Sequence, residues 1–190
     1  SPYGVSKCFA HWITVNYREA YKIFACNGIL FNHESPIRGE TFVTKKIIQG
    51  LIRIKYGHQE KLFLGNLYSK RDWGHARDYV EAMWKMLQQT KPNDYVISTG
   101  KTFTIKEFVN KTAKKIGLKI KWTGKGINEK AINIKNKKII IECKKRYFRP
   151  LEVEYLRGNS QKAKKLLKWS PKISIDNLID EMIEHELEIL

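Results

Sequence analysis

A tyrosine and a lysine stand four residues apart at the start of this 190-residue chain, in the segment Ser1–Lys7. Residues at this spacing share one face of a helix, so the Lys7 ammonium can lie close to the Tyr3 phenol. A phenol with a pKa of about 10 is a poor base at neutral pH, but a nearby cation favours the phenolate. The pair is therefore a candidate for proton transfer, although the same spacing is also typical of a solvated helical turn.

A second polar group follows the mostly apolar run at residues 22–31, which predicts a central parallel strand covered on both faces. Ligands of open α/β sheets bind at the carboxyl ends of the strands, where Asn32 and His33 stand. Arg38, a few residues later, is a fixed cation suited to a phosphate. The alternatives are that His33 satisfies backbone groups and that Asn32 is an ordinary turn residue.

Composition limits the class of protein. Apolar residues make up 42% of the chain, enough for a core, and the aromatic content of 12% argues against disorder. The formal net charge of +17 suggests a polyanionic partner, but its lysines are spread along the whole chain. Because no RNA- or DNA-binding signature accompanies the charge, we expect no nucleic-acid partner.

The three cysteines, Cys8, Cys26 and Cys143, are odd in number and far apart, which fits buried thiols in a reducing cytosol. No histidine stands at ligand spacing from them, so we predict no metal site. No signal peptide is visible, and no apolar run approaches the roughly 20 residues of a membrane span. We therefore expect a soluble, cytoplasmic protein without a membrane partner.

Hydrophobic periodicity predicts that helices alternate with strands, so the fold class is α/β. Strands are expected at residues 62–65 and 95–98, with short β pieces around a loop at 124–138. A helix starting near Ser160 stops before Pro171, and Ser174 caps a last helix with Leu187 among its inward residues. The remaining helices are predicted at residues 3–21, 42–56, 75–89 and 104–117.

Residues 25–44, which include Asn32-His-Glu-Ser-Pro, closely resemble the GDP-mannose 4,6-dehydratases of the extended short-chain dehydrogenase/reductase superfamily. The likeness covers nearly the whole chain except about 124–142, where the family carries a variable insertion. One departure is Ile37, where the family pattern has a second arginine, so any charge-dependent role of that position is in doubt. The other matching blocks are residues 64–66, 71–79, 86–89, 147–154 and 167–171.

The resemblance implies a partial Rossmann-like sheet with a smaller C-terminal α/β substrate-binding region. Residues 1–40 and 75–100 would complete the Rossmann-like core, and 41–74 and 101–190 would form the sugar-nucleotide-binding region. The family's glycine-rich turn, catalytic Ser/Thr and catalytic glutamate precede its Tyr-x-x-x-Lys helix and are not found in these residues. We therefore expect the C-terminal part of a dehydratase, without the N-terminal dinucleotide half and inactive alone, with apolar surface uncovered at residues 22–31.

Carried over residue by residue, the resemblance makes Tyr3 the catalytic tyrosine. Lys7 would lower the pKa of this phenol and bind the nicotinamide ribose of NADP, while His33 and Arg38 would also contact NADP. Two simpler possibilities are a surface ion pair between Arg71 and its neighbour Asp72 and a pair between residues 149 and 152. The positions that match the GDP-mannose site are Asn32, Val43, Lys46, Arg71, Arg149 and Glu152.

The implied reaction converts GDP-mannose to GDP-4-dehydro-6-deoxy-D-mannose. NADP oxidises C4, water is lost across C5 and C6, and hydride returns to C6, so the cofactor is regenerated. The family also implies a homo-oligomer, either a dimer or a tetramer. Two alternatives remain: another nucleotide-sugar epimerase or reductase using the same Tyr3 and Lys7 pair, and a basic nucleic-acid-binding module whose affinity would fall steeply with salt.

Overall fold

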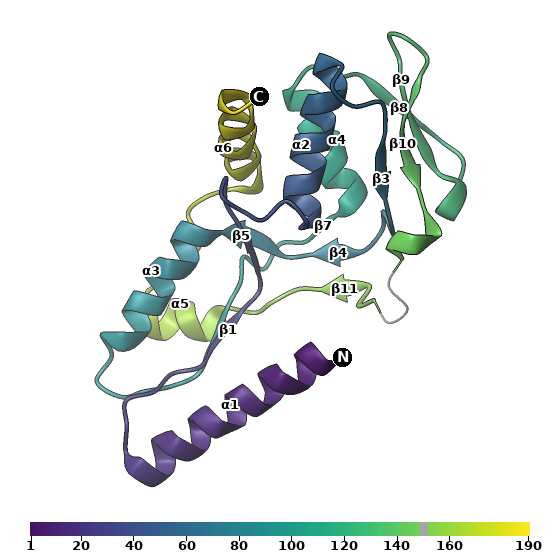
Figure 1. The fold of residues 1–190 in the computed structure, drawn as a ribbon. Coiled ribbons are helices and arrows are strands. Elements are labelled where there is room, and N and C mark those ends of the chain that lie inside the picture. The colour runs from purple at the N-terminus through teal and green to yellow at the C-terminus, as the bar shows by residue number, and fades with distance from the viewer. Residues whose placement is uncertain (149–151) are drawn as a thin grey trace.

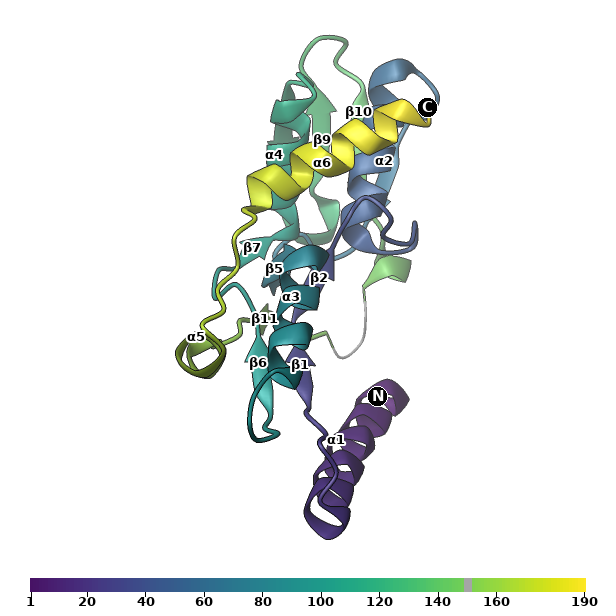
Figure 2. The ribbon, with the colours of Figure 1, turned by 90° about the vertical axis from the view of Figure 1, so that its left-hand side faces the viewer.

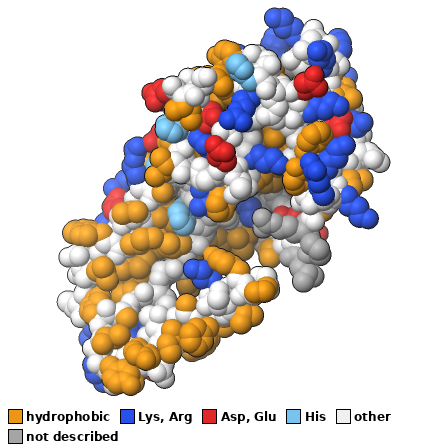
Figure 3. Space-filling view, in the orientation of Figure 1, with side chains coloured by type: hydrophobic (Ala, Val, Ile, Leu, Met, Phe, Trp, Pro, Cys, Tyr) orange, Lys and Arg blue, Asp and Glu red, His pale blue; other side chains and the backbone are white. Residues whose placement is uncertain are grey.

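The computed structural model describes residues 1–148 and 152–190. Its first element is the long helix α1 (Pro2–Tyr21), which confirms the helix predicted at 3–21 (Figure 1). The Ser1 side chain accepts a hydrogen bond from the Gly4 amide, and proline at the first helical position suits a helix start. All residues of α1 are described and none is buried; its exposed apolar side chains lie in the lower part of Figure 3.

The strand β1 (Gly28–Leu30) pairs in parallel with β6 (Tyr95–Ile97), which confirms the strand predicted at 95–98. The strand is parallel, as predicted, but the predicted cover on both faces over 22–31 is wrong, and the expected uncovered apolar surface is confirmed at Ile23, Phe24 and Ile29. Among the described residues β1 has β6 as its single neighbour, and Ile29 is 45% exposed. Because side chains alternate along a strand, Leu30 packs on the core cluster around Met86 while Ile29 faces away from it.

A second parallel pair, β2 (Asn32–Glu34) with β5 (Trp73–His75), leads into α3 (Ala76–Leu87). The helix predicted at 75–89 is confirmed, but its apolar stripe is mostly exposed, and Tyr79 is the only buried member. The other members of that stripe are Val80, Met83, Trp84 and Leu87. The buried face of α3 instead presents Asp78, Tyr79, Ala82 and Met86.

The larger core lies between helices and a four-stranded sheet. In Figures 1 and 2, α2 (Val43–Tyr56) and α4 (Ile105–Lys115) separate this sheet from α6 (Ile175–Glu188). Ile48, Phe108 and Met182 contribute side chains with no exposed surface to this core. The sheet has the order β3 (Leu62–Leu64), β10 (Ile139–Cys143), β9 (Lys130–Asn133) and β8 (Ile120–Thr123).

Local capping signals set the starts of α4 and α6, whereas the start of α2 has no side-chain cap. Thr104 and Glu107 form a capping box at the start of α4, and Ser174 accepts from the Asn177 amide at the start of α6. The helices predicted at 42–56, 104–117 and from Ser174 are therefore confirmed. The inward placement of Leu187 is wrong, because this side chain, in the last turn of α6, is 42% exposed.

The remaining elements are short. A three-stranded sheet joins β4 (Lys70–Arg71) to β7 (Phe103–Thr104) and β11 (Tyr155–Leu156), and α5 (Gln161–Leu167) is the helix predicted after Ser160. Two 3-10 turns, Gly126–Asn128 and Lys145–Tyr147, flank the antiparallel strands β9 and β10. In the described part of the chain, no helix is both long and apolar enough to cross a membrane.

Candidate functional site

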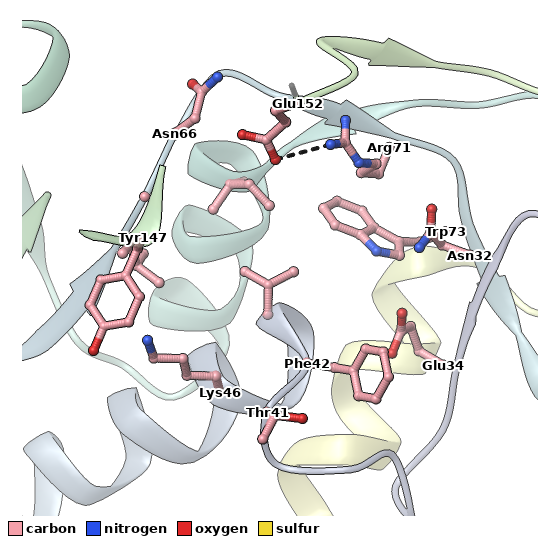
Figure 4. A pocket seen from close by; sticks show the side chains of 14 residues that line it. Asn32, Glu34, Thr41, Phe42, Lys46, Asn66, Arg71, Trp73, Tyr147 and Glu152 are labelled. Atoms are coloured by element: carbon pink, nitrogen blue, oxygen red, sulfur yellow. Dashed lines mark hydrogen bonds and ion pairs between the residues drawn. The ribbon is translucent and has the colours of Figure 1, made fainter. Parts of the chain in front are cut away.

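A cavity of about 520 Å³ opens between β2, the first turn of α2, the carboxyl end of β3 and the β4–β5 segment (Figure 4). We call it the central pocket. Sequence-predicted substrate residues from four parts of the chain line it: Asn32, Val43, Lys46, Arg71 and Glu152. The sixth predicted residue, Arg149, lies outside the described residues, as does its suggested pairing with Glu152.

The strand β2 divides two sets of predicted residues between its faces. Asn32 and Glu34 line the central pocket. His33, between them, stacks on the Tyr79 ring with 4.9 Å between ring centroids. Its Nδ1 lies 2.9 Å from the Phe31 carbonyl oxygen, which can only accept, so Nδ1 carries the proton.

The first turn of α2 forms the positively polarised wall of the pocket. The N-cap residue Phe42 has no polar side-chain atom to accept from the first-turn amides, and the positive end of the helix dipole adds to their attraction for an anion. Lys46, one turn into the helix, places its Nζ 4.0 Å from the centroid of the Tyr147 ring. Burial lowers the pKa of Lys46, and a bound anion would raise it again.

Arg71 and Glu152 pair on the opposite wall. The Arg71 Nη2 lies 3.1 Å from a Glu152 carboxylate oxygen, and its Nη1 donates to the Val153 carbonyl at 2.5 Å. The suggested surface pair between Arg71 and Asp72 is wrong. Asp72 is fully buried, and its carboxylate accepts hydrogen bonds from the Thr99 and Gly100 amides.

Glu34, Trp73 and Tyr147 are among the pocket-lining residues that sequence reasoning missed. All three stand in blocks that resemble the dehydratases, but neither spacing nor residue type shows that they face one cavity. Trp73 and Tyr147 supply aromatic surface, Lys46 and the first turn of α2 supply positive potential, and the Asn32 amide can both donate and accept. Such a lining suits an anionic ligand that also carries flat rings.

Tyr3 and Lys7, the predicted acid–base pair, lie apart from this cavity. Tyr3 is 71% exposed, and the Lys7 ammonium lies 5.5 Å from the centroid of its ring. Neither residue is among the described residues that line the central pocket. Helix α1 is held near its other end, where Arg18 donates to both carboxylate oxygens of Asp94. Hydrogen bonds from Arg18 hold the pKa of Asp94 well below its usual range, while its burial opposes this shift.

Arg38 is fixed in the loop between β2 and α2. Its Nε lies 3.0 Å from a Glu34 carboxylate oxygen, and its guanidinium carbon is 3.4 Å from the centroid of the Phe42 ring. The Arg38 guanidinium and the Lys7 ammonium are donors that fit the phosphates and ribose of a dinucleotide. No cluster of three or more histidine, cysteine or carboxylate side chains that could hold a metal ion occurs among residues 1–148 and 152–190.

Comparisons with known sequences find matches along most or all of the chain. The family model described as GDP-mannose 4,6 dehydratase matches residues 1–182. The chain is similar to a GDP-mannose 4,6 dehydratase of Dictyostelium discoideum, with 54% identity over 100% of this chain and 53% of the relative. It is also similar to GDP-mannose 4,6 dehydratase 1 of Arabidopsis thaliana, with 53% identity over 100% of this chain and 48% of the relative. The chain thus spans about half the length of the curated relatives it matches.

Solved structures share the fold at low sequence identity. RMD from Pseudomonas aeruginosa, solved with NADPH, superposes with a TM-score of 0.83 at 19% identity, over 100% of this chain and 57% of the other. A dTDP-glucose 4,6-dehydratase of Bacillus anthracis, solved with NAD, gives a TM-score of 0.77 at 20% identity, over 99% of this chain and 52% of the other. These likenesses show a shared fold, and a fold by itself does not determine function.

Proposed function

The chain belongs to the GDP-mannose 4,6 dehydratase family, and we propose that its central pocket binds GDP-mannose for an NADP-dependent dehydration. One observation carries the proposal. Residues separated by more than 100 positions, from Asn32 to Glu152, were assigned to the substrate one by one, and they line a single cavity. Chance association of surface residues does not account for such convergence.

The pocket wall formed by α2 is the proposed diphosphate site. First-turn amides without a polar side-chain cap, together with the partly buried Lys46, favour a ligand with two negative charges. On the opposite wall, the Glu152 carboxylate offers acceptors for ribose hydroxyls or a guanine edge. Arg71 orients that carboxylate through their ion pair. The Tyr147 ring, which is 39% exposed, offers the apolar surface that a sugar or base ring needs.

Tyr3 is the proposed acid–base group at C4 of the sugar. As a phenolate it would accept the C4 hydroxyl proton, and the Lys7 ammonium on the same helix face would favour that ionised form. NADP, held by Lys7, His33 and Arg38, would supply hydride exchange with the sugar. No residue of this chain is assigned to the C5 proton. The proposal for these 190 residues therefore covers sugar-nucleotide binding and proton transfer at C4.

Selective binding tests this proposal. Calorimetric titration of the 190-residue chain with GDP-mannose, GDP and UDP-glucose should give the highest affinity for GDP-mannose and measurable affinity for GDP. UDP-glucose should bind at least about tenfold more weakly, because a pocket with polar groups matched to one base leaves them unpaired against another. Equal or tighter binding of UDP-glucose would favour an epimerase or reductase of the same superfamily and would reject the proposed substrate.

A further inference from the structure

Glu34 is a buried carboxylate at the end of β2, with 2% of its surface exposed. Burying a charge is costly unless it is paired, so a carboxylate retained at this position requires partners. Its Oε2 accepts a hydrogen bond from the Thr44 hydroxyl at 2.8 Å and forms an ion pair with the Arg38 Nε at 3.0 Å. One oxygen atom therefore joins the loop between β2 and α2 to the first turn of α2.

The Arg38 guanidinium is held on its edge and on its face. Glu34 contacts Nε, and the Phe42 ring lies against the plane of the group at 3.4 Å. The contact at Nε is an ion pair without hydrogen-bond geometry, because the buried Arg38 Nε has no hydrogen-bond partner within residues 1–148 and 152–190. A guanidinium has five N–H donors, and the fork of Nη1 and Nη2 is the part that matches a phosphate.

The loop around Arg38 is itself anchored. The Arg38 amide donates to the Ser35 carbonyl at 3.0 Å, closing a turn. Lys45 donates to the Pro36 carbonyl at 3.1 Å and forms a buried ion pair with Glu186 of α6, with 2.7 Å between Nζ and Oε2. Because the backbone is fixed on both sides, the direction of the Arg38 side chain depends mainly on its contact with Glu34.

We propose that Glu34 is a positioning residue that orients Arg38 toward a phosphate of the dinucleotide and links this site to the wall of the central pocket. This inference rests on the proposed function, in which Arg38 contacts NADP. The link runs through Thr44, because the same turn of α2 carries Val43 and Lys46 into the pocket. Glu34 acts on the ligand through Arg38, so it is not a catalytic residue.

Electrostatics and positioning predict opposite results when the charge of Glu34 is removed. A carboxylate near a phosphate repels it, so Glu34→Gln should tighten NADP binding if charge alone matters. If Glu34 orients Arg38, the same substitution should weaken NADP binding about fivefold to tenfold, as expected for loss of one charge-assisted contact. Glu40→Gln is the matched control, because Glu40 is an exposed carboxylate on the same loop that lies outside the pocket lining.

Three further variants make this test independent of folding and of net charge. Glu34→Asp keeps the charge but withdraws the carboxylate from Arg38, and it should weaken NADP binding like Glu34→Gln. Arg38→Met should weaken NADP binding to the same extent, and the double variant Glu34→Gln/Arg38→Met should be no weaker than Arg38→Met alone. Additive losses in this cycle, or unchanged NADP affinity in both Glu34 variants when Arg38→Met is impaired, would overturn the proposal.

A ligand-free measurement separates this inference from the proposed function. In the 190-residue chain, the Arg38 Nε–H signal should be resolved by NMR, and Arg38→Lys should remove it. Glu34→Gln should move this signal to the position of a mobile arginine, while Glu40→Gln should leave it unchanged. If the wild-type chain binds no NADP, the cofactor assignment fails and this measurement still decides whether Glu34 orients Arg38. An Arg38 signal that is unchanged in Glu34→Gln would reject the positioning role.

Discussion

Asn32 and His33 are consecutive residues on β2 with side chains on opposite faces of the strand. Asn32 lines the central pocket, and His33 stacks on Tyr79 of α3. A strand alternates its side chains, so neighbouring residues of one short motif can serve two different ligands. In the proposed function, one face of β2 meets the sugar nucleotide and the other meets the dinucleotide.

Lys46→Met should weaken GDP binding to the 190-residue chain about tenfold. The substitution keeps most of the side-chain volume but removes the cation from the proposed diphosphate site, where a charge-assisted contact is worth about 1.5–3 kcal/mol. Calorimetry gives the affinity. Lys125→Met, which alters an exposed lysine in a loop outside the pocket, is the control and should change the affinity less than twofold. Equal losses in both variants would show a non-specific charge effect.

Asp94→Asn should destabilise the attachment of α1 by about 1–3 kcal/mol at neutral pH, because it removes the charged partner of Arg18. Asp94 also accepts from the Asn27 amide and side chain. The attachment can be followed by limited proteolysis between α1 and β1. Glu19→Gln, on the same helix, is the control and should leave the rate of cleavage nearly unchanged.

The same substitution should change how stability depends on pH. The pKa of Asp94 is lower in the folded chain than its ordinary value of 3.8, so its contribution is fully present above that value. The wild-type chain should lose this contribution as the pH falls below about 3.8. The Asp94→Asn variant lacks the contribution at every pH, so it has nothing to lose in acid. The stability difference between the two proteins should therefore shrink in acid. A difference that grew as the pH fell would contradict this assignment.

Glu186→Gln should destabilise the fold by about 3–5 kcal/mol, because it leaves the Lys45 ammonium buried without its charged partner. The double variant Lys45→Met/Glu186→Leu removes both charges and should recover most of that loss, since apolar residues can replace a buried pair. Urea unfolding measures both free energies. If the double variant lost as much free energy of unfolding as its two single substitutions lose together, the pairing would be contradicted.

Gly65→Ala should distort the central pocket. A Cβ built at Gly65 would lie 2.3 Å from the backbone oxygen of Tyr147, so this backbone must move. We expect a loss of about 1–3 kcal/mol in stability and weaker GDP binding, because the Tyr147 ring contacts Lys46. Gly39→Ala is the control, since its nearest neighbour, the Phe42 ring, would lie at an ordinary contact distance of 3.5 Å. Normal GDP affinity in Gly65→Ala would show that the backbone at Tyr147 does not shape the pocket.

Local signals were sufficient to predict the helices of this protein. Thr104 and Ser174 cap the helices predicted after them, and apolar periodicity located α2 and the inward face of α6 apart from Leu187. Such signals act over a few residues, so they can be read from the chain itself. Periodicity also showed that one stripe of α3 and the run at residues 22–31 are apolar. It could not show which of these side chains would be covered by other parts of the chain. That depends on neighbours distant in the sequence.

The candidate site likewise has some features that the sequence predicted and others that only the tertiary structure decided. Residue types and their order in blocks resembling the dehydratases selected Asn32, Lys46 and Arg71, which the fold gathers around one cavity. Only the tertiary structure decided that Arg71 pairs with Glu152 instead of Asp72, and that a buried Glu34 holds Arg38. A carboxylate has the same chemistry wherever it stands in a sequence. Its partners are chosen by packing, because burial makes an unpaired charge too costly to keep.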